Sequence, residues 1–152
     1  MLSWLAMLKT DTDSFARLVN ANRAILIKTL SLLCQNPLSE VSEALTTHAV
    51  THGYVNIRTP PKATALKCWY ISEYAPQWAC RSAFDLLCQL GWLPKSDIEK
   101  AIAARYLLLN NYSISDDWLK LLGNWLIIAQ HISRTRKNSH ITGNNTPTEN
   151  QK

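Results

Sequence analysis

The chain has 152 residues and a formal net charge of +5, with 47% hydrophobic and 18% charged residues. This composition is typical of a single globular domain and excludes a fully disordered chain. Only four glycines are available for tight turns, whereas six tryptophans provide large packing side chains, so an all-α fold is favoured. We predict a compact bundle of five or six helices over residues 1–137, followed by a polar, disordered tail over residues 138–152.

The first two helices are predicted from apolar residues at helical spacing. The first is long and amphipathic and covers residues 14–36, because Pro37 cannot continue it. The second begins at Ser39, has acidic residues in its first turn and ends at Gly53. Residues 54–61 contain a Pro-Pro pair, which predicts an extended linker rather than a central strand.

The third predicted helix runs from about Lys62 to Tyr74 and stops before Pro76. Pro76 suits the first turn of the fourth helix, which Gly91 ends. This fourth helix is apolar or small apart from one narrow stripe, so we expect it to occupy the centre of the bundle. The stripe consists of Gln77, Arg81, Asp85 and Gln89.

Two further helices begin at recognisable capping sequences. The stretch "SDIE" at residues 96–99 is a capping box and opens a helix that ends near Asn110 and Asn111. Ser115 is the predicted cap of the last helix, whose first turn is acidic. From Asn138 onward the chain has few apolar residues, which predicts the tail.

No catalytic or cofactor signature is present. Glycine-rich phosphate loops and serine elbows are absent, and paired carboxylates occur only at helix starts, where capping explains them. His48 and His52 have the spacing of two metal ligands on one helical face, but the glutamate of an HExxH motif is missing. We therefore expect hydrogen-bonded or solvated histidines near a helix end, and no metal or other cofactor.

The cysteines and the apolar stretches bear on the compartment. Cys34, Cys68, Cys80 and Cys88 lack CxxC spacing, which favours reduced cysteines used as small core residues. The apolar start at residues 1–8 is too short for a signal peptide, and the longest apolar stretches are too short or interrupted for a membrane span. We expect a cytoplasmic protein without a membrane partner.

Positive charge accumulates in two stretches that contain no acidic residue, between Glu43 and Glu73 and between Asp117 and Glu149. The first also holds Tyr54, Trp69 and Tyr70, whose rings could stack on unpaired bases. We predict that the stretches form one basic face; the alternative is that the rings belong to the core and the cations only solubilise a linker and a tail. The predicted phosphate contacts are Arg17, Lys28, Arg58, Lys62, Lys67, Arg134, Arg136 and Lys137.

These observations predict a non-enzymatic subunit that binds the backbone of RNA or DNA with little sequence choice, together with other protein subunits in a ribonucleoprotein or defence-type complex. In size, basic charge and lack of catalytic residues, the chain is similar to the small helical subunits of CRISPR interference complexes, although no sequence motif carries this similarity. A helix-turn-helix is disfavoured, because the linker at residues 110–117 is long and lacks a turn glycine.

Two alternative functions remain. The chain could be a protein-interaction module that docks a partner through exposed aromatic side chains, for which Trp4, Trp78, Trp92 and Trp118 are the candidates. The stretch "RTRKNSH", from Arg134 to His140, has the separation of arginine and histidine found in HEPN ribonucleases, but it lacks the polar residue that usually follows the arginine.

Overall fold

The computed structural model describes residues 14–72 and 74–143, with side chains as far as Arg134. This part of the chain contains helices and connections but no strand, so the predicted all-α class is confirmed. A helix at residues 14–22 comes first. The others are α2 (Ile25–Cys34), α3 (Leu38–Thr51), α4 (Ala63–Ser72), α5 (Gln77–Gln89), α6 (Asp97–Leu109), α7 (Asp116–Leu122) and α8 (Asn124–Gly143).

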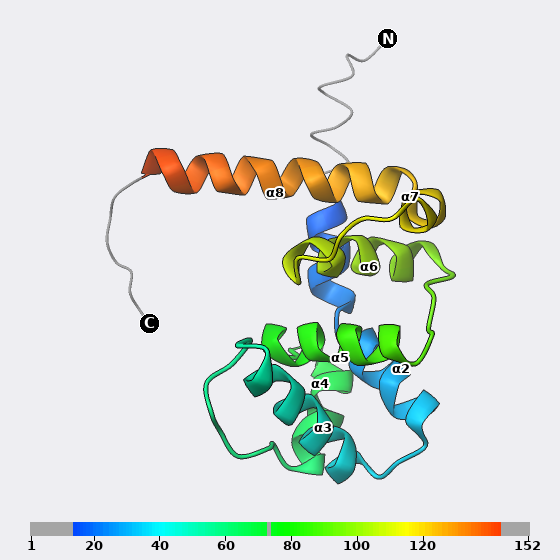
Figure 1. The fold of residues 1–152 in the computed structure, drawn as a ribbon. Coiled ribbons are helices and arrows are strands. Elements are labelled where there is room, and N and C mark those ends of the chain that lie inside the picture. Colours follow the sequence, from blue (N-terminus) through cyan, green and yellow to red (C-terminus); the bar gives the residue numbers. More distant parts are fainter. Residues whose placement is uncertain (1–13, 73, 144–152) are drawn as a thin grey trace.

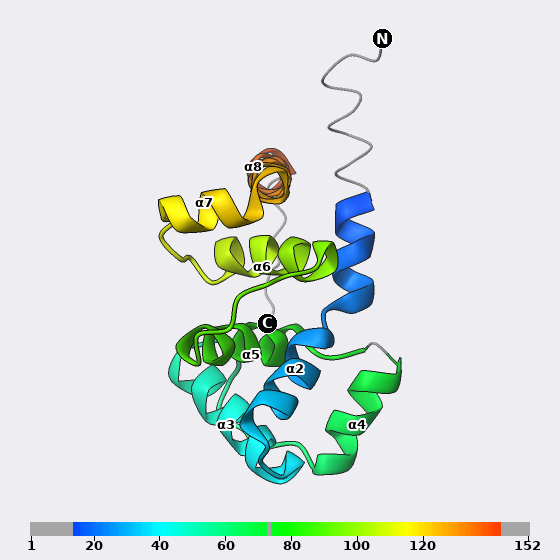
Figure 2. The same cartoon turned by 90° about the vertical axis from the view of Figure 1, so that its right-hand side faces the viewer.

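The helices form two groups that meet at α5 and α6. Helices α2, α3, α4 and α5 form one end of the molecule, and α6, α7, α8 and the helix at residues 14–22 form the other (Figures 1 and 2). Helix α5 packs against α2, α3 and α6, which confirms its predicted central position. One continuous apolar core joins the groups, and its largest buried side chains include Phe15, Leu26, Leu45, Leu66, Phe84, Ile102, Tyr106 and Leu126.

Three helices end in the same turn, in which a residue with positive φ reverses the chain and an aromatic residue follows it. At the end of α3, Gly53 has φ 76°, and the amide of Tyr54 donates to the carbonyl of Ala49 at 2.8 Å. This is the Schellman pattern, which directs the residue after the turn back toward its own helix. Helices α5 and α6 end likewise at Gly91–Trp92 and Asn111–Tyr112.

The prediction of one long helix at residues 14–36 is wrong, because the chain turns at Arg23 and Ala24. The side-chain amide of Asn22 donates to the carbonyl of Leu18 at 2.8 Å, which offers that carbonyl an alternative to the regular helical bond. The guanidinium Nε of Arg23 donates to the carbonyl of Ala75 at 2.8 Å. A contact 52 residues away in the sequence thus holds the turn.

The last predicted helix is also divided. Ser115 caps α7 as predicted, but Gly123, with φ 54° and ψ −126°, separates α7 from α8. These two breaks raise the number of helices in the described residues to eight, above the predicted five or six. Helix α8 continues to Gly143, past Asn138, where the sequence predicts the start of the tail. Residues 144–152 lie outside the described part of the chain.

The described residues also bear on the membrane and cysteine predictions. None of their helices combines the length and the apolar character needed to cross a bilayer. The four cysteines are free, and they range from buried at Cys80 to exposed at Cys68. Burial raises the pKa of the Cys80 thiol to about 12, so this side chain stays neutral and behaves as the small core residue predicted for it.

Candidate functional site

The most connected polar side chain in the described structure is Asp85 of α5, which is only 5% exposed. Its Oδ2 accepts hydrogen bonds from Nε2 of His48 at 2.8 Å and from the hydroxyl of Tyr54 at 2.5 Å. Its Oδ1 accepts bonds from Nδ2 of Asn110 at 2.9 Å and from the hydroxyl of Tyr112 at 2.7 Å. Four donors thus surround one buried carboxylate, and we call these five residues the Asp85 cluster.

Local helix-end geometry brings the two tyrosines to this carboxylate. Tyr54 follows the left-handed turn at the end of α3, and Tyr112 follows the equivalent turn at the end of α6. Each turn sends its aromatic residue back along the molecule, where α5 lies between α3 and α6. Asp85 therefore joins two helix ends that are 58 residues apart in the sequence, a separation given by the numbers of Tyr54 and Tyr112.

Arg81, one turn before Asp85 on α5, adds further polar contacts between α5 and the end of α6. Its Nε donates to Oδ1 of Asn110 at 2.8 Å, and its Nη2 donates to the carbonyl of Leu109 at 3.2 Å. Its guanidinium carbon lies 3.9 Å from the ring centroid of Tyr54, a cation–π distance. Arg81 is thus occupied by contacts within the protein, which explains why this cation does not belong to a free basic surface.

The charge of Asp85 is stabilised by its partners. Burial alone would raise the pKa of this carboxyl, but the hydrogen bonds from Tyr54, His48, Tyr112 and Asn110 outweigh burial and hold the pKa below its usual value. The pKa of the Tyr54 and Tyr112 hydroxyls is raised, by burial first and by the bond to Asp85 second. At neutral pH the cluster therefore contains an ionised Asp85 and two protonated tyrosines.

His48 of α3 and His52, which directly follows α3, are hydrogen-bonded, as the sequence predicts. An ionised Asp85 needs a donor, so Nε2 of His48 carries a hydrogen and donates to it. Nδ1 of His52 lies 2.9 Å from the carbonyl of His48, and the two imidazole rings stack with centroids 4.0 Å apart. Within the described residues, no group of three or more His, Cys, Asp or Glu side chains is arranged to hold a metal ion.

The pairing of Asp85 with His48 is also the arrangement that orients a histidine general base. In the described residues, however, no hydroxyl or thiol hydrogen bonds to His48 as a nucleophile would. The carboxylate also accepts three other donors from two separate connections. This arrangement fixes the relative positions of α3, α5 and α6.

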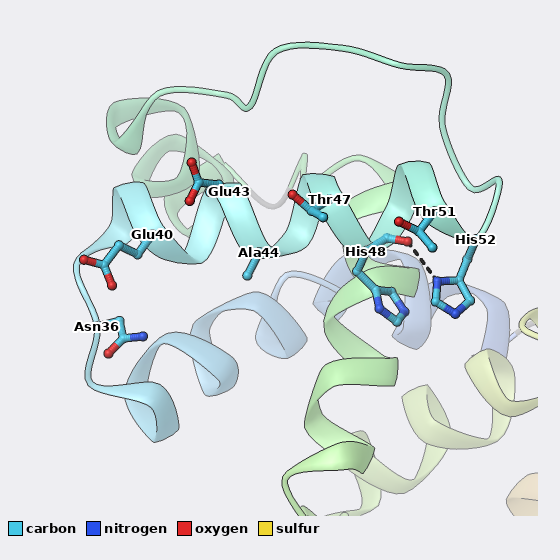
Figure 3. Close-up of a pocket in the computed structure, with 8 residues that line it drawn as sticks. All are labelled: Asn36, Glu40, Glu43, Ala44, Thr47, His48, Thr51 and His52. Atoms are coloured by element: carbon cyan, nitrogen blue, oxygen red, sulfur yellow. Dashed lines mark hydrogen bonds between the residues drawn. The ribbon is translucent and has the colours of Figure 1, made fainter.

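The outer side of α3 beside this cluster is hollowed. A hollow of about 660 Å³ follows the helix from Asn36 to His52 (Figure 3). Glu40 and Glu43 lie at one end of it and the stacked histidines with Thr51 at the other, while Ala44 and Thr47 form the middle. His48 therefore connects the buried Asp85 cluster with the surface.

The structure places six of the eight predicted phosphate contacts in two separate regions, while Arg17 lies on the helix at residues 14–22 and Lys28 on α2. Arg58 lies in the connection before α4, Lys62 immediately precedes α4 and Lys67 lies on it, and we call these three residues the linker cluster. Arg134, Arg136 and Lys137 lie on α8, and we call them the basic end of α8. The two segments lie at opposite ends of the molecule (Figure 1), so the structure does not bring the two acid-free stretches together.

The predicted cations with described side chains are exposed: Arg17, Lys28, Arg58, Lys62, Lys67 and Arg134. None of them forms an ion pair with a described residue. Arg58 lies over the ring of Trp78 at 5.0 Å, and Lys28 lines a small hollow with Tyr70. The side chains of Arg136 and Lys137 lie outside the described set.

Most of the aromatic residues predicted to stack on bases or to dock a partner pack against the protein itself. Trp69 and Trp78 pack edge to face, with centroids 6.3 Å apart, and Tyr70 bonds to the hydroxyl of Ser31 at 2.7 Å. Trp92 and Trp118 pack against Phe84. These rings are half-buried against the core, and Trp4 lies outside the described residues. Among the described side chains, the large exposed apolar ones are mostly aliphatic, and Tyr74 is the aromatic one in this group.

The sequence patterns assign no functional role to Asp85, Asn110 or Tyr112, and they indicate Tyr54 only as a ring that could stack on bases. One local signal indicates part of the cluster: the stretches "HGY", "LGW" and "NNY" repeat a helix end, a turn residue and an aromatic residue. Asp85 belongs to a polar stripe of its helix, and this pattern does not indicate that its side chain is buried. Its four partners come from positions 25 to 37 residues away.

By its architecture, the described chain is an all-α protein whose two helical groups are joined at a buried carboxylate. No family model, curated protein or solved structure matches the chain.

Proposed function

We propose that this protein is a non-enzymatic subunit that binds the sugar-phosphate backbone of RNA or DNA with little sequence choice, within a larger ribonucleoprotein or defence-type complex. The observation that carries the proposal is the exposure of six predicted cations without an ion pair to a described residue. Phosphate binding requires positive charge that nearby carboxylates do not neutralise.

The basic end of α8 is the principal contact in this proposal. Helix α8 crosses one end of the molecule, and its C-terminal part extends past α6 (Figure 1). Ile132 is the last buried side chain of α8 among those described, and the sequence after it carries Arg134, Arg136 and Lys137 with no acidic residue before Glu149. A projecting helix of this kind can approach a nucleic acid without a clash from the body of the protein.

The linker cluster supplies a second, separate contact. Its connection is held against the protein, because the hydroxyl of Ser42 donates to the carbonyl of Pro61 and Arg58 lies over Trp78. Lys62 and Lys67 remain exposed beside it. Because Trp69 and Trp78 pack against each other, we propose that this region contacts phosphates rather than stacking bases.

The test is binding of the purified chain to labelled single-stranded and duplex RNA and DNA of unrelated sequences, from about 50 to 200 mM salt. We expect similar affinities for unrelated sequences and a steep loss of affinity with salt. Replacing Arg134, Arg136 and Lys137 by alanine should reduce the slope of log affinity against log salt by about three units on duplex DNA.

The matched control removes the same charge elsewhere, through alanine at Lys95, Lys100 and Lys120. This control should keep most of the affinity, because these lysines lie outside both basic regions. Absence of binding at the lowest salt, or an equal loss in the two triple variants, would contradict the proposal.

A further inference from the structure

The exposed face of α3 has the shape of a helix-docking surface. Residues four apart along a helix form a row, and here one row runs through Glu40, Ala44 and His48. The adjacent row carries Thr47 and Thr51. Ala44 and Thr47 are small and lie between the glutamates and the histidines, so the middle of the face carries shorter side chains than its ends (Figure 3).

An apolar slot opens beside this face, between α2, α3 and α5. Its volume is about 150 Å³, enough for one large aliphatic or aromatic side chain. The hollow and the slot share Asn36, Glu40 and Ala44, so they form one continuous groove, which we call the α3 groove. Leu90 lines the slot and is 57% exposed, which leaves apolar surface at its mouth. The apolar lining consists of Leu30, Cys34, Val41, Ala44, Leu86 and Leu90.

The α3 groove is acidic on a chain whose net charge is +5. Glu40 and Glu43 are exposed, and neither forms an ion pair or a side-chain hydrogen bond with a described residue. The residues that line the hollow and the slot include no lysine or arginine. Two unpaired carboxylates beside an apolar slot are complementary to a segment with one large apolar side chain and nearby cations.

We propose that the α3 groove binds a basic amphipathic helix of a partner protein. The small residues let the axis of a second helix approach to about 8–10 Å. One apolar side chain of that helix enters the slot, and its lysines or arginines face Glu40 and Glu43. With 14 residues, α3 is about 21 Å long and matches a partner helix of about four turns.

This inference names the partner-binding surface of the proposed subunit and rests on that role, but not on nucleic-acid binding. None of the cations proposed to bind phosphate lines the α3 groove. Loss of one activity therefore leaves the other measurable in the same protein.

The probe is a synthetic amphipathic helix built of leucine and lysine only, titrated into the labelled chain at low salt. The matched probe replaces every lysine by glutamate. We expect the lysine peptide to bind and the glutamate peptide not to bind. Amide NMR signals of residues 36–52 should move on addition of the lysine peptide, while those of α8 should stay in place.

Two variants test the groove itself. The double variant Glu40→Gln, Glu43→Gln should weaken lysine-peptide binding about fivefold, because it removes two exposed ion pairs. Its control, Asp97→Asn with Asp117→Asn, removes the same charge from other helix starts. Ala44→Trp should fill the groove and weaken binding at least about tenfold, whereas Ala21→Trp, at another exposed helical alanine, should not.

Three results would overturn the proposal: no binding of the lysine peptide, equal weakening by the Glu and Asp double variants, or equal weakening by the two tryptophan variants. A concentration-dependent dimer that Ala44→Trp disrupts would overturn it too, because a second copy would then occupy the groove. Circular dichroism of each variant shows whether the helices are retained. Nucleic-acid binding measured on the same variants should not change.

Discussion

At the scale of single residues, Asp85 does the most to fix the arrangement of the helices. It is the only buried charged residue among the described side chains, and its four hydrogen bonds connect the ends of α3 and α6 to the middle of α5. Replacing a buried carboxylate leaves its donors without an acceptor, which costs more than the intact hydrogen bonds contribute.

Replacement of Asp85 by asparagine should therefore lower the free energy of unfolding by about 2–3 kcal/mol at pH 7. The amide keeps one acceptor oxygen, but its NH₂ group faces hydrogen-bond donors instead of accepting from them. Urea unfolding followed by circular dichroism measures the loss. Tyr112→Phe, which removes a single donor, should cost about 1 kcal/mol, and an Asp85→Asn variant as stable as the parent would contradict a central role for this carboxylate.

The same residue predicts a dependence on pH. Because the folded pKa of Asp85 is lowered, its stabilising effect is fully present above the unfolded pKa, near 3.8, and is lost as the pH falls through the lower folded value. Between about pH 5 and pH 2, the parent protein should lose stability more steeply than Asp85→Asn does. Unfolding curves of both proteins across this range provide the comparison, and parallel curves would exclude the contribution of Asp85.

At the scale of elements, helix ends were predictable where one or two neighbouring residues determine them. The Ser96 hydroxyl accepts from the amide of Glu99 at 3.1 Å, as the capping-box sequence predicts. Ser115 likewise accepts from the amide of Trp118. The turn at Arg23 could not be predicted in this way, because its partner Ala75 is distant in the sequence.

The break between α7 and α8 had a local signal, since Gly123 was visible within the predicted last helix. The residues around it keep helical spacing, however, and this periodicity favours one continuous helix.

The Asp85 cluster, too, is only partly predictable from the local sequence. The tyrosines follow recognisable turns, but the meeting of both turns at one carboxylate depends on how α3, α5 and α6 pack.

A substitution at Gly123 tests this break. A Cβ there would meet nothing within 4 Å, so the cost of Gly123→Ala comes from φ 54° and ψ −126°, a conformation that L-residues rarely adopt. We expect a loss of about 1–3 kcal/mol in the free energy of unfolding, measured by urea. Asn124→Ala, at the exposed first residue of α8, should change stability by less than about 0.5 kcal/mol. A Gly123→Ala variant more stable than the parent would show that the break is not required.

At the scale of the whole molecule, the arrangement of charge differs from a single basic face. The linker cluster and the basic end of α8 lie at opposite ends, with α5 and α6 between them (Figures 1 and 2). The acidic α3 groove lies at the same end as the linker cluster, on a different helix. Composition predicted the excess of positive charge, but only packing shows that it is divided.

Because the positive charge is divided between two distant regions, we expect the linker cluster and the basic end of α8 to contribute independently to nucleic-acid binding. Sites that are far apart and share no partners contribute additively, within about 0.5 kcal/mol. Alanine replacement of both triplets, Arg58, Lys62 and Lys67 together with Arg134, Arg136 and Lys137, should therefore reduce the binding free energy by the sum of the two separate losses. Anisotropy titrations of a long labelled single strand at one fixed salt concentration measure all four proteins. A combined variant that binds as well as the weaker triple variant would mean that one region alone contacts the strand, because the second replacement would then remove nothing.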